Sequence, residues 1–135
     1  MKVVFDTNVY VSALTLPKGT AAAALDSVVA GEHDLFISRP ILDELLCVLA
    51  RKFARDREEL ARVALFLSEL AVVVRPRRRL QVLKDEQDNR VLECGLAGKV
   101  DVVVTGDKQV LELGSHAVLR ILTIRKFLER SSLLS

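Results

Sequence analysis

The stretch VVVTGDKQVL, residues 102–111, decides the fold, because an apolar run ends there on a Thr-Gly turn that is followed by an acid. Runs of β-branched residues are typical of buried strands, and a Thr-Gly pair marks a change of chain direction. The first residues repeat this arrangement, since MKVVFDTNVY, residues 1–10, places an apolar run directly before Asp6. Two predicted strands therefore end on an aspartate, and a carboxylate at the end of a buried strand needs a chemical reason.

Short apolar runs of the same kind recur between longer helical patterns. The runs that predict strands lie at residues 2–5, 35–37, 72–74, 102–105 and 119–123, and the helical patterns lie at 20–31, 38–53, 56–71, 85–99 and 123–134. Continuous apolar runs are typical of strands that are covered on both faces. Helices between such strands indicate parallel crossover connections. We therefore predict an α/β fold, a three-layer sandwich with a central parallel five-stranded sheet.

Helix-capping residues predict the ends of two helices. Thr20 and Gly31 are expected to open and close the first of them, because Thr is a good N-cap and Gly a common terminator. Ser38 is expected to cap the next helix, with Pro40 in its first turn. The helical boundaries therefore rest on local chemistry as well as on periodicity.

The size and composition of the chain indicate one compact domain, residues 1–135. Half of the residues are hydrophobic and 28% are charged, which is the balance of a soluble globular protein. The apolar runs are far too short to span a membrane, and the first residues show no signal-peptide pattern. We therefore expect a cytoplasmic protein with no membrane association.

The cysteines and histidines offer no competing chemistry. Cys47 and Cys94 lack the paired spacing of a zinc site or a disulfide framework, so we expect two buried thiols. His33 and His116 lie on loop-like stretches far from the acids, and we expect surface histidines without a catalytic role. No Ser-His-Asp or Cys-His nucleophile set is predicted.

Four acids fall near the carboxyl ends of predicted strands or at the adjoining helix starts: Asp6, Glu44, Asp88 and Asp107. In an open parallel sheet, this edge is where ligands bind. Carboxylates that are brought together repel one another, so a fold keeps them mainly where a cation neutralises them. Carboxylate oxygens suit hard cations such as Mg²⁺ or Mn²⁺. The pattern predicts a metal site built from these four residues.

Each acid also has a purely structural interpretation. Asp6 and Asp107 could cap short helices that begin one residue later, because Asp is a favoured N-cap. Asp85 and Asp88 could be first-turn acids that the helix dipole favours, and Glu44 could belong to a solvated helix face. These alternatives stay open for each residue taken singly.

The chain resembles a known family along nearly its whole length. In order, the stretches FDTNVYVSAL, SRPILDELLCVL, DEQDNRVLECGLAGKVDVVVTGDKQVLEL and LRILTIRKFLE resemble the PIN domain, particularly its single-domain, VapC-like toxin type. The resemblance implies sheet order 3-2-1-4-5 and Mg²⁺- or Mn²⁺-dependent ribonuclease activity. It further implies the toxin component of a toxin-antitoxin pair, a homodimer or higher oligomer held inactive by a small antitoxin protein.

The resemblance also assigns roles to individual residues. Asp6, Glu44, Asp88 and Asp107 match the family's catalytic, metal-binding acids. Asn8 and Thr105 match supporting polar positions that hydrogen-bond the acids, and Asp85 falls at a variable acidic position whose role stays open. Gly95 departs from the family, which usually has Ala there, and a glycine inside a helix is expected to mark close packing.

Basic residues are needed beside such a site, because an acidic pocket repels a polyanionic substrate. The segment VRPRRRLQVLK, residues 74–84, supplies the candidate RNA-binding side chains Arg75, Arg77, Arg78, Arg79 and Lys84. A second basic cluster consists of Arg51, Lys52, Arg55 and Arg57. Neutralisation of phosphates by such residues is the main source of affinity for nucleic acid. For both clusters the alternative is an ordinary solvated face.

Two rival functions remain. A phosphotransfer hydrolase with Asp6 as covalent nucleophile would want a second Asp where this chain has Asn8. A catalytically silent PIN-like module that binds RNA or protein would be marked by the loss of an acid, and none is lost. RNA hydrolysis is therefore the favoured prediction.

Overall fold

The computed structural model describes residues 1–134, with side chains up to Ser131. Its centre is a sheet of order β3-β2-β1-β4-β6-β5. The strands are β1 (Lys2–Phe5), β2 (Asp34–Ser38), β3 (Val72–Val74), β4 (Val102–Val104), β5 (Ser115–His116) and β6 (Leu119–Leu122). All neighbouring strands are parallel except β5 and β6, which are antiparallel. The order of the five predicted strands is confirmed, and β5 adds a sixth strand that the sequence did not predict.

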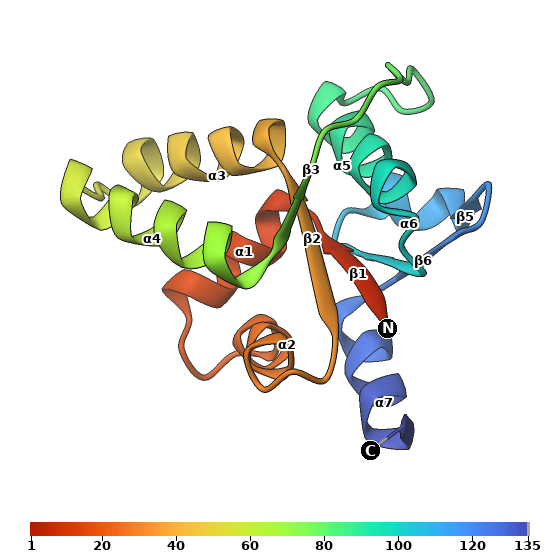
Figure 1. Cartoon of the computed structure of the whole chain (residues 1–135), viewed down its shortest axis with the longest axis horizontal. Helices are drawn as coiled ribbons and strands as arrows, with labels where there is room; N and C mark the ends of the chain where they lie inside the picture. Colours follow the sequence, from red (N-terminus) through yellow and green to blue (C-terminus); the bar gives the residue numbers. More distant parts are fainter. Residues whose placement is uncertain (135) are drawn as a thin grey trace.

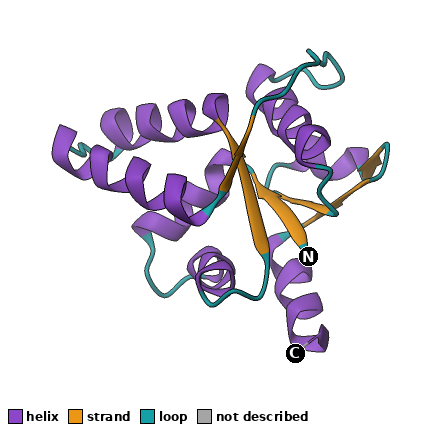
Figure 2. Ribbon diagram, viewed as in Figure 1, coloured by secondary structure: helices purple, strands orange, loops and turns teal. Residues whose placement is uncertain are grey.

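Helices cover both faces of the sheet (Figure 2). They are α1 (Thr7–Thr15), α2 (Thr20–Val29), α3 (Arg39–Lys52), α4 (Arg57–Leu70), α5 (Glu86–Gly98), α6 (Lys108–Leu113) and α7 (Ile124–Leu134). Figure 1 shows α1 to α4 on one side of the sheet and α5 and α6 on the other. The three-layer α/β sandwich predicted from the apolar runs is confirmed.

The core lies on both faces of the central strands. Every residue of β4 is buried, as are Val3, Val4 and Phe5 of β1. The Phe5 ring packs against the rings of Tyr10 and Phe127, with centroids 5.7 and 5.8 Å apart. Burial on two faces explains why these strands read as unbroken apolar runs. The edge strand β3 differs, because the side chains of Val72 and Val73 are exposed.

Two predicted caps differ in detail from the structure. Gly19 rather than Thr20 occupies the N-cap position of α2, and Thr20 is the first helical residue. Ser38 does occupy the N-cap of α3, but its buried hydroxyl makes no capping hydrogen bond. Gly31 follows α2 with φ of +82°, a conformation that glycine adopts without strain.

Close packing against the sheet holds α5 in place. A Cβ atom on Gly95 would lie 3.1 Å from Leu119 Cδ1, and one on Gly98 would lie 2.8 Å from Phe36 Cδ1. Gly95 therefore marks a tight helix-sheet contact, as the sequence indicated. Since Asp88 lies on the first turn of α5, this contact also sets the position of that carboxylate.

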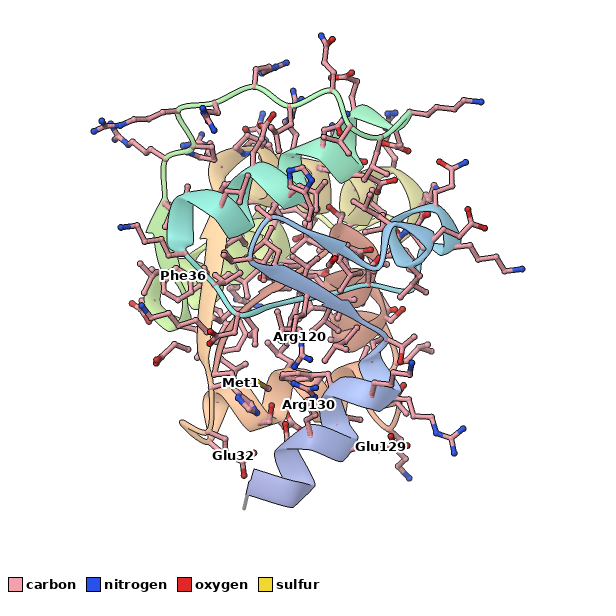
Figure 3. The ribbon with its side chains drawn as sticks, turned by 90° about the vertical axis from the view of Figure 1, so that its right-hand side faces the viewer. Met1, Glu32, Phe36, Arg120, Glu129 and Arg130 are labelled. Carbon is pink, nitrogen blue, oxygen red and sulfur yellow. The ribbon has the colours of Figure 1, made fainter. Side chains whose placement is uncertain are left out.

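Some predictions about isolated side chains were wrong. Cys94 is buried as expected, but Cys47 is exposed on the outer face of α3. His33 is buried rather than superficial, and its Nδ1 lies 3.1 Å from the amino group of Met1. Its Nε2 lies 2.6 Å from Ser131 Oγ on α7. Figure 3 shows Met1 at the same end of the molecule as Arg130 of α7.

Among the helices described for residues 1–134, none combines the length and the apolar character that a membrane crossing requires.

Candidate functional site

The pairing of β1 with β4 places Asp6 beside Thr105. Phe5 is the register partner of Val104, so the residues that follow these two strands are neighbours. Thr105 Oγ1 donates a hydrogen bond to Asp6 Oδ2. The other oxygen, Oδ1, accepts from the Val9 backbone N–H at 3.1 Å and caps α1. Asp6 is thus held by two segments that are far apart in the sequence.

Thr105 also orders the segment that carries Asp107. Its Oγ1 accepts a hydrogen bond from the Asp107 backbone N–H at 3.0 Å. Asp107 caps α6, where its Oδ1 accepts from the Gln109 N–H at 2.8 Å. One hydroxyl therefore connects both aspartates that end the two central strands.

The remaining acids come from helices on opposite sides of the sheet. Asp85 caps α5 through the Gln87 N–H at 2.8 Å, and Asp88 lies on the first turn of the same helix. Asp88 is 8% exposed, and its Oδ2 is buried without a hydrogen-bond partner. Glu44 lies half-buried on the second turn of α3.

These side chains meet in one pocket of about 110 Å³. Its lining consists of Asp6, Thr7, Asn8, Glu44, Asp85, Gln87, Asp88, Val91 and Asp107. The structure thus brings together the four predicted acids, Asp85 and Asn8, while Thr105 contacts the pocket through Asp6. The pocket lies at the carboxyl edge of the sheet, where strand order reverses about β1.

Burial and mutual repulsion raise the pKa of two carboxyls. The pKa of Asp6 lies above its usual value mainly because burial penalises the charged form, and the hydrogen bond from Thr105 opposes this effect. Burial, followed by the negative charges of Asp107, Asp85 and Asp6, raises the pKa of Asp88 to about 7. The pocket therefore gathers more negative charge than its own hydrogen bonds offset.

The capping interpretation is confirmed for Asp6 and Asp107, and Asp85, which was interpreted as a first-turn acid, also caps its helix. Asp6, Asp85 and Asp107 are N-caps, and each cap uses one carboxylate oxygen. Asp88 is a first-turn acid of α5, as its structural interpretation expected, whereas Glu44 is half-buried rather than fully solvated; neither residue caps a helix. Capping also gives no reason for five carboxylates to face one small cavity, since helix starts can be capped anywhere on a surface.

The donor set suits a hard divalent cation, because it consists of carboxylate oxygens and includes an unpartnered oxygen on Asp88. As the side chains lie, no group of three His, Cys, Asp or Glu residues within the described chain surrounds a single point closely enough to hold an ion. Carboxylates without a cation between them repel one another. Joint coordination would therefore draw them inward from their positions here.

The arginine segment, defined as residues 75–84, leads from the end of β3 toward the start of α5 (Figure 1). Its candidate RNA-binding side chains Arg75, Arg77, Arg78, Arg79 and Lys84 are all exposed. Arg79 lines a cavity of about 440 Å³ together with Glu44 and Gln87, which also line the acidic pocket. The segment and the acidic pocket therefore share a continuous surface.

The second basic cluster lies elsewhere. Arg51 follows Glu44 by seven residues on α3, which is about 10 Å along a helix, and the cluster ends at the turn into α4. Arg55 there pairs with Glu59 at 3.1 Å. This cluster lines none of the cavities that adjoin the acidic pocket among those found in the described chain.

Sequence reasoning missed three buried polar residues on α5: Asn89, Arg90 and Glu93. They bond the backbone of the arginine segment. The local sequence gives little signal for this burial, because α5 carries as many polar residues as an ordinary surface helix.

Comparison with known proteins bears on the family and the fold of this chain. Residues 2–109 match the family model described as the PIN domain. The uncharacterized protein MJ1680 of Methanocaldococcus jannaschii is 30% identical over 117 residues, which are 84% of this chain and 75% of that protein. A crystal structure of VapBC2 from Rickettsia felis, bound to a DNA fragment from its promoter, contains a similar chain with a TM-score of 0.66. That match covers 91% of this chain and 98% of the other at 15% identity, so the likeness is one of fold.

The family match extends from β1 through the start of α6 and includes all the acids of the pocket, so the chain belongs to the PIN domain family.

Proposed function

We propose that this protein is a divalent-metal-dependent ribonuclease that hydrolyses RNA phosphodiester bonds. The observation that carries the proposal is the convergence of Asp6, Glu44, Asp88 and Asp107 on one pocket from four separate elements. PIN domains are generally nucleases, which supports the same reaction class.

Asp6, Glu44, Asp88 and Asp107 would hold Mg²⁺ or Mn²⁺. The ion, when bound, would lower the pKa of a water nucleophile and offset the charge that develops on the phosphoryl oxygens. At neutral pH the Asp88 carboxyl is partly protonated in the metal-free pocket, because burial and the neighbouring acids raise its pKa to about 7. Cation binding would therefore release that proton and give the carboxylate the partner it lacks.

The supporting residues Asn8, Thr105 and Asp85 would orient the carboxylates and the substrate in the acidic pocket. Thr105 keeps Asp6 and the start of α6 together, which leaves less freedom for the two carboxylates to rotate apart. Asn8 is exposed at the rim of the pocket, where its amide can reach a substrate phosphate or a carboxylate. Asp85 lines the pocket beside Asp88, and we assign it a share of the negative charge.

The arginine segment would supply the attraction for RNA. Arg39, Arg75, Arg77, Arg78 and Arg79 line a cavity of about 650 Å³ next to the one that Arg79 shares with Glu44. Phosphates bound along these arginines would lead the RNA backbone to the acidic pocket. Replacement of Arg77, Arg78 and Arg79 by Ser should weaken RNA binding and flatten its salt dependence. An unchanged salt slope would show that these arginines do not contact RNA phosphates and belong to an ordinary solvated face.

Direct assay of the reaction tests the proposal. Purified protein is incubated with structured and unstructured RNAs in the presence of Mg²⁺, Mn²⁺ or a chelator. We expect cleavage that depends on the metal and is absent from Asp6→Asn protein. A folded wild type that binds RNA but cuts none of it under any condition would favour the silent binding module instead.

We further propose that the protein is a cytoplasmic toxin that forms an oligomer and pairs with a small antitoxin. The similar fold of a chain from the Rickettsia felis VapBC2 structure supports this partner class. A small reading frame beside this gene, encoding a DNA-binding protein, would be co-expressed with it. Co-purification and loss of ribonuclease activity are expected, and two proteins that elute separately would contradict the pairing.

A further inference from the structure

The arginine segment has a fixed path although it forms neither helix nor strand. Residues 77–84 make no backbone-to-backbone hydrogen bond within the described chain. Backbone groups of Leu80, Val82 and Leu83 are bonded instead by side chains of α5, the helix that carries Asp88. Leu80 and Leu83 add apolar contacts with the core. The path of the segment therefore depends on a few polar side chains of one helix.

Asn89 makes most of these bonds. Its Oδ1 accepts from the backbone N–H groups of Val82 at 3.1 Å and Leu83 at 2.8 Å. Its Nδ2 donates to the Leu83 carbonyl at 2.8 Å, and the side chain is completely buried. These bonds use both the carbonyl oxygen and the NH₂ group of the side-chain amide. They fit Asn well, because Asp lacks the donor and Leu lacks both groups.

Arg90 and Glu93 bond the segment two residues earlier. Glu93 Oε2 accepts from the Leu80 N–H at 2.7 Å, and Arg90 Nη2 donates to the Leu80 carbonyl at 3.3 Å. The two side chains also form a buried ion pair, with Arg90 Nε 3.0 Å from Glu93 Oε1. Since their charges offset each other, the pair holds Leu80 without adding net charge next to the acidic pocket.

We propose that Asn89, supported by the Arg90–Glu93 pair, is a positioning residue that holds the arginine segment at a set distance from the acidic pocket. This inference rests on the proposed ribonuclease function. Asp88 and Asn89 are consecutive on α5, so their side chains leave the helix about 100° apart. Asp88 faces the acidic pocket while Asn89 bonds the arginine segment. The first turn of α5 therefore fixes the position of the Asp88 carboxylate and, through Asn89, the position of the arginine segment.

Kinetics of an Asn89→Ala variant distinguish positioning from general stabilisation. Loss of the three bonds frees the segment, so fewer of its arginines contact phosphate at the same time while the acidic pocket stays intact. We expect KM for RNA to rise about tenfold and kcat to change less than about threefold. The salt dependence of binding should flatten, and the thermal shift caused by Mg²⁺ should persist. Gln81→Ala is the matched control, because Gln81 is an exposed residue of the same segment.

The inference is overturned if folded Asn89→Ala protein keeps the KM and salt slope of an active wild type. A wild type that cleaves no RNA would instead refute the ribonuclease proposal. Amide hydrogen exchange of the wild type tests the positioning by Asn89 if the protein cleaves no RNA. It also tests it if the Asn89→Ala variant does not fold. If the Val82 and Leu83 amides exchange as slowly as the amides of α5, the positioning by Asn89 is supported. Exchange as fast as in an unprotected loop overturns it.

Discussion

The two ends of the sheet treat their polar groups in opposite ways. At the amino end, the amino group of Met1 donates to His33 Nδ1, His33 Nε2 bonds Ser131 Oγ, and the Lys2 N–H bonds Asp101 Oδ2 at 2.9 Å. At the carboxyl end, five carboxylates line one pocket, and Asp88 Oδ2 is buried without a partner.

This difference indicates where the molecule favours stability and where it favours binding. Buried polar groups normally find hydrogen-bond partners, because an unpaired one costs free energy. The amino end follows that rule with pairs from distant segments. The carboxyl end departs from it, and the missing compensation is what a bound cation would supply. Four predictions test whether the contrast is one of function.

The largest expected effect is on catalysis. Asp88→Asn keeps the shape of the side chain but removes a charge that would hold the ion, so RNA cleavage should fall by about 10³-fold, equivalent to about 4 kcal/mol. His33→Gln, at the opposite end, should leave cleavage per folded molecule unchanged. Initial rates measured at saturating Mg²⁺ decide the point. Equal losses in both variants would remove the functional contrast between the two ends.

Metal should stabilise the carboxyl end specifically. At a concentration one hundred times the dissociation constant, a bound ion adds about 2.7 kcal/mol to the free energy of unfolding. Wild type should gain this stability and Asp107→Asn should gain little. Melting curves with chelator and with millimolar Mg²⁺ or Mn²⁺ measure the gain. Identical shifts in the two proteins would show that the ion binds somewhere other than the acidic pocket.

The two ends should respond to pH in opposite directions. The pKa of Asp88 is raised from 3.8 to about 7, so the folded state binds more protons than the unfolded state in this range. Stability without metal is therefore lost as pH rises from about 4 to 7. Allowing for solvent screening, Asp88→Asn should recover about 1–3 kcal/mol at pH 8 and almost nothing at pH 4.

His33 should give the reverse trend. Its pKa is lowered from 6.5 by burial and by the neighbouring amino group of Met1, and Glu32 and Asp34 oppose that shift. The unfolded state binds the proton more readily, so this contribution to stability is lost as pH falls below about 6.5. Chemical denaturation of wild type, Asp88→Asn and His33→Gln across pH 4–8 separates the two effects. A single common pH profile would contradict both.

The smallest effect concerns one charge at each end. Asp107→Asn removes repulsion and keeps capping capacity, so the metal-free protein should be as stable as wild type or more stable, by about 1 kcal/mol at most. Asp101→Asn at the amino end relieves no such repulsion and should be neutral or slightly destabilising. Urea midpoints with chelator compare them. A destabilised Asp107→Asn would show that its carboxylate serves the fold rather than a cation.

Much of the fold was predictable because its signals are local and repeated. Unbroken apolar runs predicted β1 and β4, and the order of the strands followed from a family resemblance carried by the acids and the Thr-Gly-Asp turn. The two-residue strand β5 was missed, because a strand of that length has no periodicity. The convergence of the acids could be predicted because each lies shortly after a strand or within the first two turns of a helix beside one.

Other features of the molecule depend on contacts between distant segments. Nothing near His33 in the sequence indicates its burial, which arises because α7 and the first residue pack against it. Cys47 was expected inside because its neighbours are apolar, but it lies on the solvent side of α3. The bonds from Asn89 to Val82 and Leu83 were missed as well, since they depend on where an irregular segment folds back.

The hydrogen bond between Thr105 and Asp6 joins residues that are 99 positions apart, and this separation governs when the pocket appears during synthesis. A ribosome adds about 5–20 residues per second, so roughly 5–20 s pass between the addition of Asp6 and that of Asp107. Throughout that interval the growing chain carries β1 without the strand and the turn that complete the acidic pocket. A nascent chain that ends before Asp107 therefore has no complete acidic pocket, and the messenger being translated is not exposed to one from the same chain.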